Sequence, residues 1–288
     1  MKRILVVDYE PALRELFSEV LVRAGYDVST AEDGVEALAR LRGESFDLLL
    51  LDIWMPRMNG LEVLGHLHEQ AAPPRVIVTT GDTTPETVLK AIREQAYRYI
   101  SKPCEPSQLV EVVRGALEAP AAPPPIEVIS ARPHWVELLV PCELHAAERI
   151  QEFMTHLKSD LPHEVRDRVG QAFRELLLNA IEWGGQLDPN RKVRIAYLRG
   201  QRMLMYRISD PGPGFRFENL EHAAVGHAPS KVLEHVAVRE EKGIRPGGFG
   251  ILMAQAMVDE IIYSEAHNEV VLIKYLDTPG GTPTGANT

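Results

Sequence analysis

The chain has 288 residues, of which 45% are hydrophobic and 25% charged, with a formal net charge of −10. This length fits two domains of ordinary size. The negative balance argues against a general nucleic-acid binder, which needs clustered Lys and Arg to displace counterions from phosphate. No apolar run approaches the roughly 20 residues that span a bilayer. Ile4–Val7 is too short for the core of a signal peptide.

The cysteines indicate the cellular compartment, and a proline-rich stretch indicates a domain boundary. Cys104 and Cys142 lack metal-ligand spacing, which fits a reducing cytoplasm. Glu118–Pro125 reads EAPAAPPP, a poor helix or strand because proline lacks an amide donor. We therefore predict a cytoplasmic protein with domains at 1–118 and 131–277, a linker at 119–130 and a disordered tail at 278–288.

The first half alternates short apolar runs with helical patterns. The predicted strands are Ile4–Val7, Tyr26–Ala31, Phe46–Leu51, Val76–Thr80 and Tyr97–Ser101. Helical spacing follows the first two of them, and a last helix begins at Pro106. Continuous apolar runs are typical of strands buried on both faces. The pattern predicts a doubly wound α/β fold with a five-stranded parallel sheet.

The second half has a different order. The predicted strands are Val136–Val140, Lys192–Leu198, Met203–Ser209 and Val270–Tyr275, and the predicted helices are Ala146–Lys158, Glu164–Trp183 and Gly250–Val258. Two of the strands are expected to be antiparallel neighbours joined at Arg199-Gly200. With the helices on one face of a mixed or antiparallel sheet, this is a two-layer α/β sandwich.

Four polar residues fall at the carboxyl ends of the predicted parallel strands, where doubly wound sheets bind ligands. They are Asp8, Asp52, Thr80 and Lys102. A carboxylate can attack a phosphoryl group, and Mg²⁺ prefers hard oxygen ligands such as two carboxylates. The Lys102 ammonium could then neutralise the product and the Thr80 hydroxyl could donate a hydrogen bond to it.

These segments resemble the receiver domain of response regulators, which has a flavodoxin-like fold. The matching motifs are ILVVD at Ile4–Asp8, LLLLDIWMP at Leu48–Pro56, VIVTTG at Val76–Gly81 and YISKP at Tyr99–Pro103. The resemblance implies that Asp52 is the phosphoacceptor and that Asp8, Asp52 and the backbone carbonyl of Trp54 bind Mg²⁺. Thr80 and Lys102 would sense the phosphoryl group. Tyr99 would be the rotamer-switch aromatic, with a plain core tyrosine as the alternative.

One position departs from the receiver pattern. Receivers usually carry adjacent acids after the first strand, but Asp8 is followed by Tyr9. Losing one anionic ligand should weaken Mg²⁺ binding. A degenerate receiver that serves only as an interaction module therefore stays open beside one that is phosphorylated on Asp52.

Three motifs in the second half point to a nucleotide. In FRELLLNAIEWG, Phe173–Gly184, Glu175 and Asn179 share one helix face. In SDPGPGF, Ser209–Phe215, Asp210 could accept a hydrogen bond from an exocyclic amine such as that of adenine. In RPGGFGILMAQAMVDEI, Arg245–Ile261, a glycine-rich turn offers backbone amides to phosphate at the start of a helix.

Together these motifs resemble the N, G1 and G2 boxes of the GHKL superfamily, which has the histidine-kinase-like or Bergerat ATP-binding fold. The resemblance implies ATP and Mg²⁺ as cofactors, with Asn179 reaching Mg²⁺ and Asp210 reading the adenine amine. The glycines expected to shape the pocket are Gly212, Gly214, Gly247, Gly248 and Gly250. The ATP lid would span Phe217–Pro246, where Lys231, Lys242 and Arg245 meet phosphate or are simply solvated.

Within that superfamily the domain looks most like the anti-sigma-factor serine kinases, where Glu175 would be the catalytic base. This implies a receiver, phosphorylated on Asp52, that regulates a protein serine/threonine kinase. Two alternatives stay open: a nucleotide-gated anti-sigma binding module without kinase activity, and an atypical histidine kinase using His163. The expected partners are an upstream histidine kinase and an anti-sigma-factor antagonist or sigma factor. Neither nucleic acid nor a membrane is expected as a partner, and a homodimer is left open.

Overall fold

A computed structural model describes residues 1–67, 73–81, 84–119, 124–132, 134–157, 161–216 and 249–276. The chain forms two compact units. The first contains Met1–Ile126 and Glu148–Asp160, and the second contains Glu127–Ala147 and Leu161–Thr288. Among the described residues, no helix combines the length and the apolar character needed to cross a bilayer.

The first unit is built on a five-stranded parallel sheet with the order β2-β1-β3-β4-β5. Its strands are β1 (Arg3–Val7), β2 (Asp27–Ala31), β3 (Leu48–Asp52), β4 (Arg75–Thr80) and β5 (Arg98–Ser101). All five residues of the central strand β3 are buried, as expected for a strand covered on both faces. The predicted doubly wound fold is confirmed.

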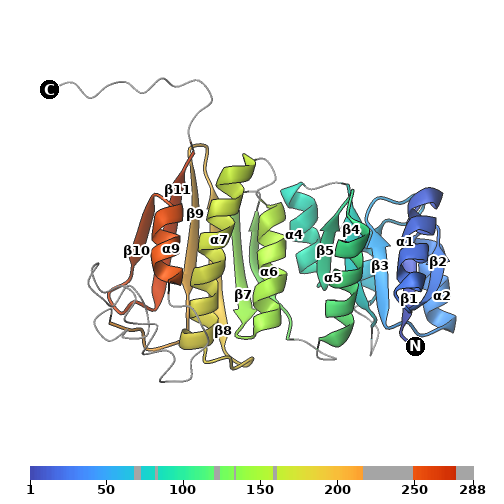
Figure 1. The fold of residues 1–288 in the computed structure, drawn as a ribbon, viewed down its shortest axis with the longest axis horizontal. Coiled ribbons are helices and arrows are strands. Elements are labelled where there is room, and N and C mark those ends of the chain that lie inside the picture. The colour runs from blue at the N-terminus through green and yellow to red at the C-terminus, as the bar shows by residue number, and fades with distance from the viewer. Residues whose placement is uncertain are drawn as a thin grey trace. The chain divides into compact units, whose positions relative to one another are not determined.

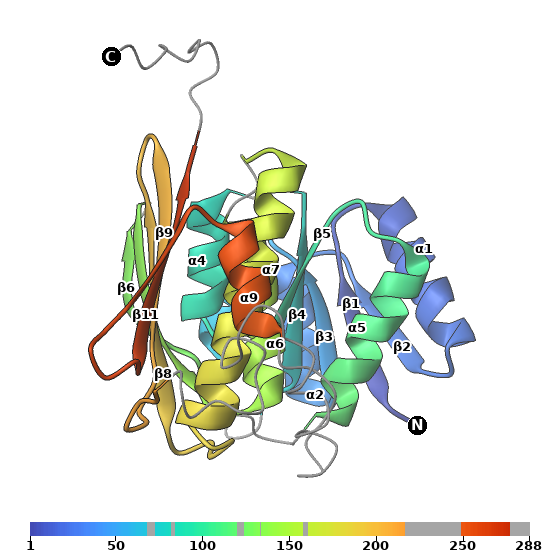
Figure 2. The same cartoon turned by 60° about the vertical axis from the view of Figure 1, so that its left-hand side comes forward.

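Helices cover both faces of this sheet (Figures 1 and 2). They are α1 (Pro11–Arg23), α2 (Gly34–Gly43), α3 (Gly60–Leu67), α4 (Pro85–Arg93) and α5 (Pro106–Glu118). Three of them begin with proline, whose fixed φ suits the first helical turn and whose missing amide costs nothing there. On one face, Phe17 and Leu21 of α1 and Leu109 and Val113 of α5 join a single core cluster with the sheet.

The second unit is built on a six-stranded antiparallel sheet with the order β10-β11-β9-β8-β7-β6. Its strands are β6 (Glu127–Arg132), β7 (Trp135–Pro141), β8 (Lys192–Arg199), β9 (Met203–Ser209), β10 (Glu260–Tyr263) and β11 (Glu269–Tyr275). The helices are α6 (Leu144–His156), α7 (His163–Asn179) and α9 (Gly250–Met257). Since α7 and α9 lie side by side on one face of the sheet, the predicted two-layer sandwich is confirmed (Figure 2).

Two edge strands were not predicted. Strand β6 occupies residues 127–132, so its first four residues fall in the segment that the sequence assigned to the linker. The residues of β6 are half-buried at most and give no continuous apolar run, so the sequence did not distinguish this strand from the Pro-rich stretch before it. Strand β10 follows α9 directly, after Val258 turns to an extended backbone with φ −121° and ψ 170°. The predicted helix ended at Val258, but the four residues of β10 are too few to give a strand pattern of their own.

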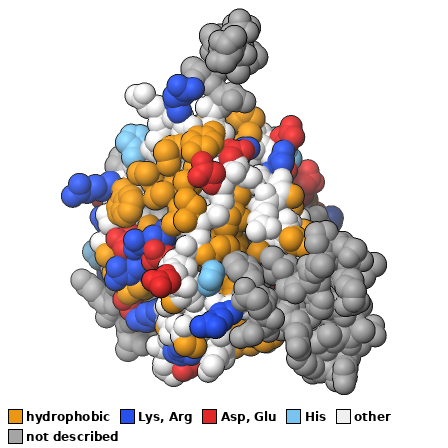
Figure 3. All heavy atoms as spheres, turned by 90° about the vertical axis from the view of Figure 1, so that its left-hand side faces the viewer, with side chains coloured by type: hydrophobic (Ala, Val, Ile, Leu, Met, Phe, Trp, Pro, Cys, Tyr) orange, Lys and Arg blue, Asp and Glu red, His pale blue; other side chains and the backbone are white. Residues whose placement is uncertain are grey.

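The other face of the six-stranded sheet carries exposed apolar side chains. Ile262 is paired with Val271, which is paired with Arg207, and these side chains share one face of the sheet. Ile262 and Tyr275 are each 51% exposed. Figure 3 shows hydrophobic side chains gathered on the side of this unit that carries β10 and β11. Tyr206 and Leu272, which point the other way, are fully buried.

Most of α6 packs within the first unit. The Nε atom of Arg149 donates to the carbonyl oxygen of Tyr97 at 3.0 Å, and its guanidinium lies 4.8 Å from the centre of the Tyr97 ring. The Arg98 guanidinium pairs with Glu148 at 3.4 Å and with Glu152 at 3.5 Å. Burial raises the pKa of the Glu152 carboxyl to about 7, although Arg98 partly offsets this.

Glu152→Gln is expected to reduce the pH dependence of stability. A folded-state pKa above the unfolded value of 4.5 means that the folded chain binds more protons, so wild-type stability falls as the pH rises from about 5 to 7. At about 1.4 kcal/mol per pKa unit, Glu152 changes the free energy of unfolding by at most about 3 kcal/mol over this pH range. Because its side chain is 22% exposed, we expect a change of about 1–2 kcal/mol in that free energy.

Thermal unfolding at pH 5 to 8 checks this prediction. The variant should gain stability relative to wild type as the pH rises, most steeply below pH 7. Glu111→Gln, an exposed position on α5, serves as the matched control and should track wild type. A difference in melting temperature between Glu152→Gln and wild type that stays constant across this pH range would contradict the prediction.

Candidate functional site

An acidic pocket lies at the carboxyl ends of the parallel strands. Asp8 directly follows β1 and Asp52 ends β3, and their side chains are only 1% and 3% exposed. The Lys102 ammonium follows β5 and lies 2.7 Å from Asp8 Oδ2 and 3.3 Å from Asp52 Oδ1. The structure thus brings together three of the four residues that the strand ends predicted, with one cation between two carboxylates.

The electrostatics of the pocket single out Asp52. Burial raises the pKa of its carboxyl to about 6, the nearby Lys102 ammonium lowers it, and the Asp8 carboxylate raises it again. The backbone amide of Trp54 donates a hydrogen bond to this carboxyl. Asp8 is held in a similar way, since its Oδ1 accepts from the amide of Glu10 at 3.0 Å. The two acids differ in their distance from the Lys102 ammonium, which is 2.7 Å for Asp8 and 3.3 Å for Asp52.

The remaining predicted residues lie on β4, on β5 and just after β3. Thr80 ends β4, is fully buried, and its carbonyl oxygen accepts from the amide of Lys102 at 2.9 Å. Tyr99 is also fully buried, with its ring centre 6.5 Å from that of Phe153. Its role as a rotamer switch stays a prediction. Trp54 is 54% exposed, and only its backbone was expected to take part.

Gly60 was missed by the sequence analysis. A side chain there would collide with the carbonyl oxygen of Asp52, and the Gly60 amide donates to the carbonyl of Ile53 at 2.9 Å. A glycine is therefore required for α3 to begin so close to the end of β3. The only sequence signal was a glycine eight residues after the candidate phosphoacceptor.

The donor set of the pocket fits Mg²⁺. This ion binds few protein carboxylates and keeps several waters, so two buried acids and a backbone carbonyl are adequate. Two carboxylates facing one ammonium also leave a net negative charge for a cation to offset. In the described part of the chain, no group of three or more His, Cys, Asp or Glu side chains is arranged so that it could hold a metal ion by itself.

The second candidate site begins at the end of α7. Asn179 is the last residue of this helix, and a π-helical turn, η1 (Ala180–Gly184), follows it. Such turns are rare and occur frequently at functional sites. The turn brings Gly184 against Asp210, so closely that any side chain at Gly184 would collide with the Asp210 carboxyl. Two motifs that are far apart in the sequence thus meet here.

Asp210 is fixed within this site. Its Oδ1 accepts a hydrogen bond from the amide of Gly212 at 2.7 Å, and a Cβ atom at Gly212 would lie 2.7 Å from the same oxygen. Burial raises the pKa of the Asp210 carboxyl, while the hydrogen bond from Gly212 and the charge of Arg191 lower it. Arg191 also donates to the carbonyl oxygen of Pro211 at 2.7 Å. The Asp210 carboxylate, a hydrogen-bond acceptor, is thereby held in one orientation by the loop around it.

The third motif reaches the same helix. A Cβ atom at Gly250, the first residue of α9, would lie 2.6 Å from Glu175 Oε2. Glu175 precedes Asn179 by one helical turn, so both lie on one face of α7. The predicted residues Gly247, Gly248, Lys231, Lys242 and Arg245, with the whole of the predicted lid, lie outside the described residues. Trp183 is 49% exposed within the π-helical turn.

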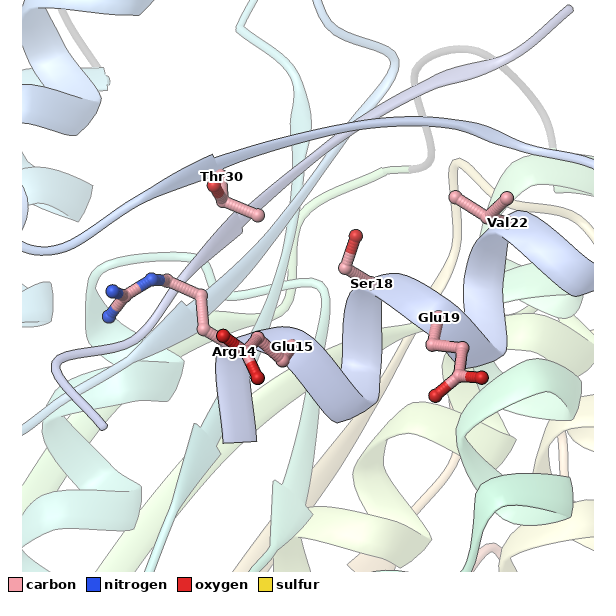
Figure 4. Close-up of a pocket in the computed structure, with 6 residues that line it drawn as sticks. All are labelled: Arg14, Glu15, Ser18, Glu19, Val22 and Thr30. Carbon is pink, nitrogen blue, oxygen red and sulfur yellow. The ribbon is translucent and has the colours of Figure 1, made fainter. Parts of the chain in front are cut away.

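A further hollow is found in the first unit. It is formed between α1 and β2 in the first unit and is lined by Arg14, Glu15, Ser18, Glu19, Val22 and Thr30 (Figure 4). None of the predicted site residues lines it. Arg14 does connect to the acidic pocket, because its Nη1 donates to the carbonyl oxygen of Asp8 at 2.6 Å.

Known families account for both units. Residues 4–114 match the family model of the response regulator receiver domain. Residues 140–274 match that of the histidine kinase-like ATPase domain. The DNA-binding response regulator MtrA of Mycolicibacterium smegmatis is 35% identical over 184 residues, which cover 64% of this chain and 78% of MtrA. The chain belongs to the response regulator family.

A second relative matches this response regulator over a shorter stretch. The alginate biosynthesis transcriptional regulatory protein AlgB of Pseudomonas aeruginosa is 39% identical over 107 residues, covering 37% of this chain and 24% of AlgB. MtrA is named as a DNA-binding response regulator. In the present chain, residues 140–274 match the ATPase domain instead.

Solved structures also match the receiver part of this response regulator. A CheY-like receiver domain protein from Methanospirillum hungatei is 34% identical, with a TM-score of 0.40, and the match covers 41% of this chain and 94% of that one. The response regulator TrrA from Thermotoga maritima, in complex with Mg²⁺ and BeF, is 39% identical with a TM-score of 0.38 and is covered completely. The receiver and ATPase domains together make this a two-component signalling protein with an ATP-binding domain.

Proposed function

We propose that the receiver accepts a phosphoryl group on Asp52 and thereby regulates an ATP-dependent protein serine/threonine kinase of the anti-sigma-factor type. The proposed domain limits are 1–118 and 131–277. The observation that carries the proposal is that the second and third motifs both contact the first. Gly184 abuts Asp210, and Gly250 abuts Glu175. The proposed base thus lies beside the start of α9, and the proposed acceptor for adenine lies against the end of the same first motif.

In the receiver, an oxygen of the Asp52 carboxylate would attack phosphorus on an upstream histidine kinase. The new bond is between this oxygen and phosphorus, and the bond from phosphorus to the donor histidine nitrogen breaks. Mg²⁺, held by Asp8, Asp52 and the Trp54 carbonyl, would offset the charge of the phosphoryl group. The Lys102 ammonium already contacts both acids and would pair with the product, while Thr80 would donate a hydrogen bond to it.

In the ATPase domain, Asp210 would accept from the adenine amine and Asn179 would contact the Mg²⁺ of the nucleotide. Glu175 would take the proton from a Ser or Thr hydroxyl of the partner as its oxygen attacks the γ-phosphorus, and ADP would leave. The Glu175 carboxylate is adjacent to Gly250 at the start of α9, where backbone amides can face phosphate. The expected substrate is an anti-sigma-factor antagonist.

Glu175→Gln is expected to abolish transfer while ATP still binds, because the amide cannot accept the hydroxyl proton. The purified protein would be incubated with γ-labelled Mg-ATP and a lysate from its own source. We expect an acid-stable labelled band with wild type and at least a roughly 100-fold weaker one with Glu175→Gln. Glu164→Gln, an exposed acid at the start of the same helix, is the matched control.

The alternatives predict different results in the same assay. ATP binding without any labelled band would favour a nucleotide-gated binding module. An acid-labile label lost in His163→Gln would favour a histidine kinase. His163 is exposed, and its Nδ1 lies 2.9 Å from Asp167 Oδ2 one turn along α7. A label of equal strength in Glu175→Gln would rule out Glu175 as the base.

A further inference from the structure

The turn between β10 and β11 is tied to the loop that carries Asp210. The carbonyl oxygen of Asn268 accepts a hydrogen bond from the Asp210 amide at 2.9 Å. The Asn268 side chain donates from Nδ2 to the carbonyl oxygen of Gly212 at 3.2 Å. One residue therefore holds the loop on both sides of Pro211, outside all three nucleotide motifs of the sequence.

The same turn holds the far end of this loop. The Phe215 amide donates to the carbonyl oxygen of Ala266 at 3.1 Å. Gly214 has a φ of +83°, and a side chain there would collide with that carbonyl. The Phe215 ring packs against Tyr263 and His267, with ring centres 6.0 Å and 5.3 Å apart. Gly214 is therefore required by the turn, whether or not it also shapes a nucleotide pocket.

The Asn268 amide is itself oriented. Its Oδ1 accepts a hydrogen bond from the Ser264 hydroxyl at 3.3 Å, which leaves Nδ2 directed at Gly212. The Ser264 hydroxyl oxygen in turn accepts from the amide of Glu269 at 3.2 Å. A chain of hydrogen bonds, called the relay below, therefore links Glu269, the first residue of β11, through Ser264 and Asn268 to the Asp210 loop.

Such a relay matters because the loop alone is poorly constrained. Glycines at 212 and 214 give its backbone wide freedom. The Asp210 carboxylate accepts from the Gly212 amide, so any motion of Gly212 moves the hydrogen bond that aims this carboxylate. Fixing the Gly212 carbonyl from outside the loop keeps that acceptor in place before a ligand arrives, which lowers the cost of binding.

We propose that Asn268 is a positioning residue for adenine selection, which orients Asp210 through Gly212. The proposal rests on the proposed ATP site and extends it to a residue that no nucleotide motif includes. Asn268 would not touch the nucleotide. Its contribution should therefore show in the preference for adenine over guanine nucleotides rather than in the affinity for phosphates.

Asn268→Asp tests the proposal with little change of shape. The carboxylate can still accept from Ser264 but cannot donate to the Gly212 carbonyl. Losing a hydrogen bond worth about 1 kcal/mol corresponds to a roughly fivefold change in affinity. We expect ATP to bind about five- to tenfold more weakly, while GTP binding, measured by competition with a fluorescent nucleotide, is unchanged. Ser264→Ala should also reduce the preference for ATP over GTP, but by less than Asn268→Asp does.

Two further variants separate the possible outcomes. Asn190→Asp changes an exposed asparagine that pairs with Asp188 in another turn, and it should bind both nucleotides as wild type does. Asp210→Asn should abolish the preference for ATP, and if it does not, the proposed adenine site itself is wrong. If Asp210→Asn abolishes the preference but Asn268→Asp retains it, or if Asn268→Asp weakens ATP and GTP equally, the positioning role of Asn268 is overturned.

Discussion

Asp52→Asn is expected to reduce the amount of covalently phosphorylated receiver by a factor on the order of 100 or more. The amide is not a nucleophile. Asp8 is the other acid of the pocket, but the Lys102 ammonium lies closer to it, 2.7 Å from Oδ2, than to Asp52, at 3.3 Å, so the charge of Asp8 is the more strongly offset. We therefore do not expect Asp8 to take over the reaction.

The measurement is intact-protein mass after incubation with acetyl phosphate and Mg²⁺. Asp27→Asn is the control, because Asp27 is an exposed acid at the start of β2, at the opposite end of the sheet from the pocket. It should be phosphorylated as wild type is. Equal phosphorylation of Asp52→Asn would contradict the assignment. No uptake by wild type itself would indicate that the substitution at Tyr9 has left a degenerate interaction module.

The fold was predictable where the chain gives a continuous apolar signal. Leu48–Asp52 and its neighbours are buried on both faces, so their sequence is almost purely apolar and identifies them without ambiguity. The edge strands β6 and β10 lack this signal. Their residues are at most half-buried, and pairing with β7 and β11 defines them. Pairing between strands is a tertiary interaction that local sequence patterns do not report.

The sites were predictable to the extent that topology brings residues together. The carboxyl ends of parallel strands meet at one edge, and this was enough to predict the contact of Lys102 with Asp8 and Asp52. The π-helical turn that carries Gly184 to Asp210 has no sequence signature. Asn268 was missed for a similar reason: it reaches Gly212 across 56 positions of sequence through the geometry of a turn.

Asn179→Ala and Asp210→Asn are expected to weaken ATP binding in two distinguishable ways. If Asn179 acts through Mg²⁺, its loss should matter only when the metal is present. If Asp210 accepts directly from the adenine amine, its loss should matter with or without metal. Hydrogen bonds to charged groups contribute about 1.5–3 kcal/mol, so each effect should be on the order of 10- to 100-fold.

Titration with a fluorescent ATP analogue in Mg²⁺ and in EDTA measures both effects. In EDTA, Asn179→Ala should bind within about twofold of wild type, whereas Asp210→Asn stays weak. Asn190→Ala, in an exposed turn, controls for the loss of an asparagine. An Asn179→Ala defect that persists in EDTA would mean that Asn179 supports the π-helical turn behind it rather than the metal. An Asp210→Asn defect that disappears in EDTA would instead assign the carboxylate, which is half-exposed beside Gly184, to the metal and leave adenine recognition to other groups.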